Sequence, residues 1–217
     1  WAEIDADLKS HLNKATPSST EDALGSDRLD YLRGIRTKEG SPFRVRSSLL
    51  GDIINSTVVF SGAPSKGHTG TGYAAFTTSY GSRTHAVFAG ANDGMLHAFN
   101  ATNGEELFGY IPSWVVPRLP ALADPAYTNA HQNYVDAPIA VDEAQVATSG
   151  SATDWKTVLV SGTGGGGHGV FALDVSDPAT FNAGKVMWEF KRSDDAAIGQ
   201  VVGEAGIMRV KTSGGDG

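Results

Sequence analysis

The feature that most constrains the fold is a short window, residues 84–112, in which three apolar runs are separated by two tight turns. The first turn is Asn92-Asp93-Gly94 and the second is Asn103-Gly104, and glycine at such places tolerates the positive φ that tight turns require. The expected strands are residues 87–90, 95–99 and 107–111. Two tight turns within one window favour an antiparallel meander over a strand–helix–strand unit.

The same arrangement returns in residues 153–193, where a glycine run replaces the first turn. That run is Gly164-Gly165-Gly166-Gly167, which we interpret as a turn or a tight backbone crossing. The strands expected there are residues 158–160, 170–175 and 186–190. Phe99-Asn100 and Leu173-Asp174 end the two middle strands in the same way. The window is therefore a repeated unit.

A further strand is expected ahead of each meander. The sequence suggests these lead strands at residues 52–61 and 136–141, and a similar segment at 203–210 resembles the lead strand of a third unit. A repeated four-stranded antiparallel unit is typical of a β-propeller blade. The alternative is a β-sandwich whose hairpins are similar by accident.

The predicted fold class is all-β: a partial β-propeller of about two four-stranded antiparallel blades plus the start of a third, with a short N-terminal helical lead-in. The lead-in and linker are expected at residues 1–42, with helices near 1–15 and 24–32, and the propeller segment at 43–217. The blades are expected at 52–111 and 136–192, and the start of the next at 201–211. Since propellers close with about four to eight blades, we expect a piece of a longer protein, the alternative being that another chain covers the open edges.

Composition narrows the classes of partner. The chain has 217 residues and a formal net charge of −7, which argues against nucleic acid as a partner. No apolar run approaches the roughly 20 residues that span a bilayer, so no membrane span is expected. The chain has no cysteine, which excludes disulfides and thiolate metal sites.

No constellation of residues predicts chemistry. The glycine run lacks the Lys-Ser/Thr and the helix that a phosphate-binding loop needs. The histidines are dispersed, although His85 and His97 were candidates to face each other across a hairpin, and no G-x-S-x-G sequence occurs. We therefore expect no catalytic residue and no metal ligand. Structural roles are expected instead for two sets of side chains, which are the tryptophans Trp114, Trp155 and Trp188 and the acidic residues Asp52, Asp136 and Glu204.

One ordered series of motifs resembles a known family. It consists of DYLRG, FRVRSSLLGDIINSTVVFSGAP, AGANDGMLHAFNATNGEELFGYIPS, HQNYVDAPI and SGTGGGGHGVFALDVSDP, between residues 30 and 178. In this order they resemble the C-terminal propeller domain of PilC/PilY-type proteins, the adhesins and assembly factors of bacterial type IV pili. The resemblance runs from about residue 30 to about residue 210, nearly the whole chain.

The resemblance implies a non-enzymatic tip component of type IV pili that supports pilus assembly and extension, adhesion and twitching motility through a rigid propeller platform. The implied partners are minor pilins, with a host or abiotic surface as a further expectation. The implied location is the cell surface at the pilus tip, or the outer membrane or a secreted state.

Two family features do not carry over to this chain. Family members bind calcium at a D-x-D-x-D-G loop that lies beyond its last residue, so no cofactor is expected within it. An RGD tripeptide of some members is matched here only by Arg33-Gly34-Ile35.

The alternative function is a periplasmic propeller scaffold or a fragment of a quinoprotein-type (PQQ) dehydrogenase. Asp93-Gly94, Ala98 and Gly104 match the repeat pattern of quinoprotein propellers. In those repeats the pattern is a packing and turn motif rather than a reaction centre.

Overall fold

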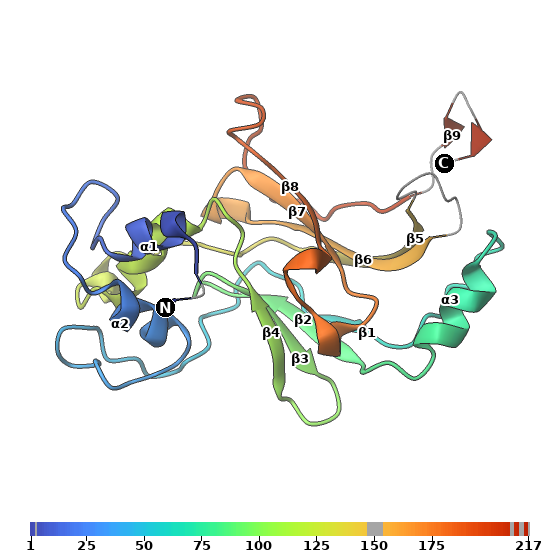
Figure 1. The fold of residues 1–217 in the computed structure, drawn as a ribbon. Coiled ribbons are helices and arrows are strands. Elements are labelled where there is room, and N and C mark those ends of the chain that lie inside the picture. The colour runs from blue at the N-terminus through green and yellow to red at the C-terminus, as the bar shows by residue number, and fades with distance from the viewer. Residues whose placement is uncertain (3, 147–153, 209–210, 213–214, 217) are drawn as a thin grey trace.

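The computed structural model describes residues 1–2, 4–146, 154–208, 211–212 and 215–216. Two four-stranded antiparallel sheets form the centre, with the two N-terminal helices at one end and a third short helix at the opposite end (Figure 1). The predicted pair of antiparallel four-stranded units is therefore confirmed. No helix among the described residues has both the length and the apolar character that crossing a membrane requires.

The first sheet has its strands in sequence order, β1-β2-β3-β4, and all neighbours are antiparallel. Its strands are β1 (Val59–Ser61), β2 (Ala86–Gly90), β3 (Leu96–Asn100) and β4 (Glu106–Tyr110). The pairing of β3 with β4 shifts register between Ala98 and Phe99. Such a bulge increases the local twist of a strand pair.

The second sheet repeats the order of the first, β5-β6-β7-β8. Its strands are β5 (Ile139–Gln145), β6 (Trp155–Gly162), β7 (Gly169–Asp174) and β8 (Val186–Lys191). Its register shift falls between Ala172 and Leu173. In the first sheet Gly90 pairs with Leu96 and in the second Gly162 pairs with Val170, so Ala98 and Ala172 hold the same place and the bulges coincide.

One apolar core joins the two sheets. Phe88, Leu96 and Ala98 of the first sheet pack in the same cluster as Leu159 and Phe171 of the second, and all five side chains are fully buried. Because alternate residues of a strand point to opposite faces, each sheet offers one face to this core. The sheets are thus held together by apolar packing.

The helical lead-in is shorter than the sequence predicted. The first helix, α1 (Ala6–Leu12), begins at Asp5, whose side chain accepts a hydrogen bond from the Leu8 amide at 2.8 Å. The second helix, α2 (Gly25–Leu32), agrees closely with the expected range. Leu12, Leu29 and Leu119 share a second core cluster, which packs both helices against the 3-10 helix η1 (Val116–Ala123).

The remaining elements are short. One of them, α3 (Tyr73–Tyr80), was not predicted, because its sequence YAAFTTSY has no helical stripe. It packs Tyr73 and Phe76 against Trp155, so a tertiary contact holds it. The others are the 3-10 helices η2 (Tyr127–Asn129), η3 (Gly164–Gly166), η4 (Pro178–Thr180) and η5 (Ala183–Lys185), and the strands β9 (Lys211–Thr212) and β10 (Gly215–Asp216), which pair with each other.

The expected lead strands were only partly right. In the first unit just Val59–Ser61 is strand, because the polar groups of residues 52–57 bond elsewhere. The Asp52 carbonyl accepts from the Asn92 amide at 3.0 Å, and the Asn55 amide donates to Asp136 at 2.8 Å. In the second unit the lead strand begins later than predicted, at Ile139.

The lead strand expected at 203–210 is absent from the part of it that the structure describes, residues 203–208. Residues 203–208 have no strand structure, and residues 209 and 210 lie outside the described residues. A strand needs a hydrogen-bonded neighbour, and none is paired with this segment in the part of the chain that the structure describes. Val201, two residues before this segment, does contact the connection between β6 and β7, since its carbonyl accepts from the Gly164 amide of η3 at 3.2 Å.

Of the three tryptophans expected to pack the blades, Trp188 is the exception. Trp155 is buried against α3, and Trp114 is partly buried beside Phe171. Trp188 is 45% exposed. It lies on the face of the second sheet that points away from the shared core, because it pairs with Ala172 rather than with Phe171 or Leu173.

Candidate partner-contact pocket

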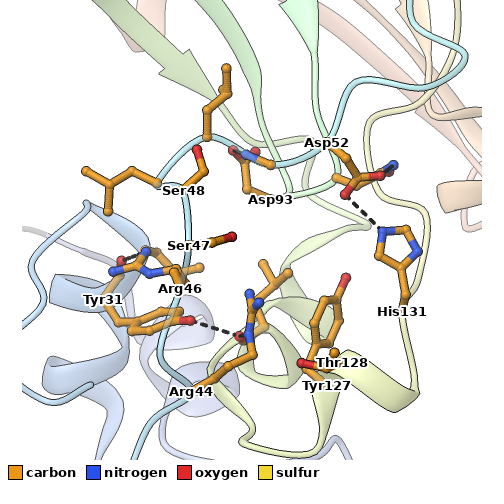
Figure 2. Close-up of a pocket in the computed structure, with 16 residues that line it drawn as sticks. Tyr31, Arg44, Arg46, Ser47, Ser48, Asp52, Asp93, Tyr127, Thr128 and His131 are labelled. Carbon is orange, nitrogen blue, oxygen red and sulfur yellow. Dashed lines mark hydrogen bonds and ion pairs between the residues drawn. The ribbon is translucent and has the colours of Figure 1, made fainter. Parts of the chain in front are cut away.

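A polar pocket of about 410 Å³ opens beside the first sheet, where four segments of the chain meet. These segments are the lead-in up to Ser48, the stretch before β1, the β2–β3 turn and the connection around η2. Figure 2 shows Arg44 and Tyr127 at one side of the opening, Asp93 and Asp52 at the other, and His131 beside Asp52.

Arg46 and Tyr31 form one wall of the pocket. The Arg46 guanidinium lies 3.6 Å from the centre of the Tyr31 ring, donates to the Tyr31 carbonyl at 2.7 Å and pairs with Glu39 at 2.7 Å. Burial raises the pKa of the Tyr31 hydroxyl, which donates to the Leu122 carbonyl. Because its charge is paired with Glu39 and its donors are bonded inside the protein, Arg46 has a structural role.

Arg44 differs from Arg46 because no carboxylate of the described residues forms an ion pair with it. Its Nε donates to the Leu122 carbonyl at 3.1 Å, and its guanidinium lies 4.9 Å from the centre of the Tyr127 ring. Its charge also acts on the neighbouring Tyr31 hydroxyl, whose pKa it lowers against the larger effect of burial. A cation held over an aromatic ring without a carboxylate partner is suited to an acceptor group on a partner.

Asp52 and His131 lie opposite Arg44 and form a half-exposed pair. The imidazole Nε2 is 3.0 Å from Asp52 Oδ1, and the Asn92 amide group donates to Asp52 Oδ2 at 3.0 Å. Burial alone would raise the pKa of Asp52, but the hydrogen bonds from Asn92 and His131 outweigh it and lower that pKa. The pocket therefore presents a carboxylate and a cation on opposite sides.

The β2–β3 turn fixes the floor of the pocket. Gly94 has a φ of 101°, and Asp93 accepts from the Gly51 amide at 2.7 Å. Asn92 accepts from the Tyr134 amide at 2.8 Å. The turn residues therefore tie three separate segments together.

His97 supports the same turn from β3. Its Nε2 lies 3.1 Å from Asp93 and its Nδ1 lies 2.6 Å from Glu106. Burial would lower the pKa of His97, but these two carboxylates raise it above 6.5. His97 pairs with Ala89 in the sheet, so the expected approach to His85 was wrong.

The other predicted turns lie away from this pocket. Gly104 has a φ of 76° and is exposed at the β3–β4 turn. The glycine run forms η3 and lies against the second lead segment, where a Cβ on Gly166 would stand 1.7 Å from the Tyr134 carbonyl oxygen. Only the Asn92-Asp93-Gly94 turn contributes to the pocket.

The expected structural roles of the acidic residues hold for two of them. Asp136 is 3% exposed and accepts from both the amide and the side chain of Asn55, while Asp52 holds Asn92 and His131. Glu204 is exposed.

No metal centre is apparent in the described ranges, which contain no group of three or more histidine, aspartate or glutamate side chains arranged to hold an ion.

Comparison with known proteins identifies the fold's family. A family model of the PilY1 beta-propeller domain matches residues 50–212. The chain belongs to the PilY1 β-propeller family. The match begins at the stretch that lines the pocket and extends through both sheets.

Curated relatives agree with this assignment. The type IV pilus biogenesis factor PilY1 of Pseudomonas aeruginosa strain PAK is 40% identical over 211 residues, which is 92% of this chain and 17% of the relative. A PilY1 homolog of Xylella fastidiosa is 36% identical over 203 residues, 89% of this chain and 16% of the relative. The chain thus spans about a sixth of the length of the curated relatives it matches.

Among solved structures, the P. aeruginosa PilY1 C-terminal domain is similar, with a TM-score of 0.46 and 32% identity over 66% of this chain and 25% of that one.

Sequence reasoning missed Arg44 and Tyr127 as pocket residues. They lie far apart in the chain and meet because Arg44 reaches the Leu122 carbonyl beside η1. The one available signal was the basic run Phe43-Arg44-Val45-Arg46, which alone does not tell a free arginine from a buried one.

Proposed function

We propose that this chain is part of a non-enzymatic type IV pilus biogenesis factor, located at the pilus tip, that supports pilus extension, adhesion and twitching motility. The family match over residues 50–212 carries this proposal, because relatives in that family are named as pilus biogenesis factors. The geometry adds a mechanism: the two sheets share one apolar core, so they form a rigid platform for the segments at its end.

The partner that we propose for the pocket is a minor pilin. Arginine is enriched among the residues that dominate the energetics of protein–protein interfaces, and Arg44 lies at the opening, packed over the buried ring of Tyr127. Leu49 and Leu50 are exposed at 48% and 38% beside them. A cation, a carboxylate and exposed leucines suit a protein surface that carries both charges and an apolar contact.

Arg44 is the residue to test. In the complete protein, we expect Arg44→Glu to reduce the amount of minor pilin that co-purifies by about tenfold or more, since reversing an interfacial charge costs affinity. A matched control is Lys66→Glu, which makes the same change of charge in the exposed loop before α3. Equal co-purification for wild type and Arg44→Glu, at equal protein levels, would exclude the pocket as the contact site.

A further inference from the structure

A second pocket, of about 660 Å³, lies on another side of the molecule and is cationic. It is formed where the end of β8, the glycine run, η1 and α1 meet. Its lining includes Arg118, Lys191 and Arg192, against one acidic residue, Asp7. Glu189, which is not part of the lining, pairs with Lys191 at 3.2 Å, so the excess of positive charge comes from Arg118 and Arg192.

Arg118 and the glycine run build the inner wall. The Arg118 guanidinium donates to the carbonyls of Gly166 at 2.5 Å and Asn133 at 2.9 Å, and lies 4.9 Å from the centre of the Tyr134 ring. Its partners among the described residues are neutral, so its charge is not cancelled locally. Backbone atoms line the rest of this wall, because Gly165, Gly166 and Gly167 have no side chains.

Arg192 is the free cation of the pocket. It is exposed, and its guanidinium forms no hydrogen bond or ion pair with any residue in the described part of the chain. Lys191, by contrast, is held by Glu189 at 3.2 Å and by the Ser113 hydroxyl at 2.6 Å. Asp7 pairs with His11 at 3.6 Å, so the acidic residue of the lining has its own partner.

The other lining groups are those that recognise a hydroxylated ligand. Ser193 and Gln200 offer a hydroxyl and an amide group, and the Trp114 ring contributes an aromatic surface, whereas the Ser113 hydroxyl is already bonded to Glu189 and Lys191. The volume lies within the range of about 300–1,000 Å³ that is typical of small-molecule pockets, which is more space than a single inorganic anion fills.

We propose that this pocket binds an acidic saccharide, with Arg192 and Arg118 facing its carboxylate or sulfate group and the hydroxyl and amide side chains contacting the sugar ring. Arginine suits this role because its planar guanidinium matches the geometry of such oxyanions. The proposal does not depend on the pilin contact, since the two pockets share no residue.

The test is calorimetric titration of the complete protein with tetragalacturonate, using neutral tetragalactose, tetraglutamate and inorganic sulfate as comparison ligands. We expect tetragalacturonate to bind at least about tenfold more tightly than any of the other three. Arg192→Glu should weaken that binding by at least about tenfold, and Arg192→Lys, which keeps the charge but lacks the planar guanidinium, should weaken it less than Arg192→Glu does. Lys66→Glu should leave the affinity within about twofold of wild type.

Three results would overturn the proposal. Tetraglutamate binding as tightly as tetragalacturonate would show a site for acidic peptides, and equal binding of sulfate would show a site for the anion alone. Equal weakening by Arg192→Glu and Lys66→Glu would show that only the total charge matters. Since Arg192 is exposed and its side chain forms no hydrogen bond or ion pair with the described residues, we expect both variants to fold, and their far-UV circular dichroism spectra check this.

Discussion

Phe108 and Trp188 occupy the same position in the two sheets, opposite Ala98 and Ala172, each beside the register shift of its strand pair. Phe108 is covered and stacks on Phe181 with 3.8 Å between ring centres, whereas Trp188 is 45% exposed. The face that the first sheet buries against the second is therefore repeated on the second sheet, with a larger aromatic side chain at this position.

This repetition predicts that the face around Trp188 is covered in the complete protein by a further sheet of the same kind. The expected result is that hydroxyl-radical footprinting of the complete protein oxidises Trp188 as slowly as Trp155, which is 7% exposed here. Trp1, which is 37% exposed, serves as the comparison. Oxidation of Trp188 at the rate of Trp1 would show that this face stays open.

Substitution of the two turn glycines, Gly94 and Gly104, separates the cost of backbone strain at positive φ from the cost of a steric clash with neighbouring side chains. Both have positive φ, but a Cβ on Gly94 would meet Leu119 at 2.5 Å, while one on Gly104 would meet nothing within 4 Å. We expect Gly104→Ala to cost about 1 kcal/mol of unfolding free energy and Gly94→Ala about 2 kcal/mol or more, with Gly94→Val worse still. Urea denaturation of the three variants checks this, and equal losses for the two alanine variants would contradict it.

The contact between Asp136 and Asn55 joins the second lead segment to the first. Asp136 is buried, and its two carboxylate oxygens accept from the Asn55 amide and side chain. Asp136→Ala should cost about 1–3 kcal/mol, because the backbone amide and the side-chain amide of Asn55 lose their acceptor. In a double-mutant cycle with Asn55→Ala, which removes only the side-chain donor, the two losses should be clearly less than additive. Additive losses would mean that the side-chain hydrogen bond contributes nothing.

His97 should make stability depend on pH. Its pKa is raised in the folded state by Asp93 and Glu106, so its stabilising contribution is complete below the ordinary value of 6.5 and is lost as pH rises through the folded-state value. The difference in unfolding free energy between wild type and His97→Gln should therefore be larger at pH 5.5–6 than at pH 9. A difference that stays constant over that range would show that the ion pairs do not contribute.

The repeat could be predicted from sequence because its signals are local. Asn92-Asp93-Gly94 and Asn103-Gly104 mark turns by their own conformational preferences, and apolar runs between them mark strands. The features that sequence reasoning missed depend on residues far apart in the chain. The short β1 follows from the contact of Asn55 with Asp136, α3 follows from packing on Trp155, and the pocket follows from Arg44 reaching Leu122.

The most direct test of the account is the number of surface pili on cells whose chromosomal gene lacks residues 50–212, compared with cells carrying the intact gene at an equal protein level. The proposed role in pilus biogenesis predicts strongly reduced surface pili and loss of twitching, both restored by the intact gene. Normal numbers of pili and normal twitching in the deletion strain would contradict that role.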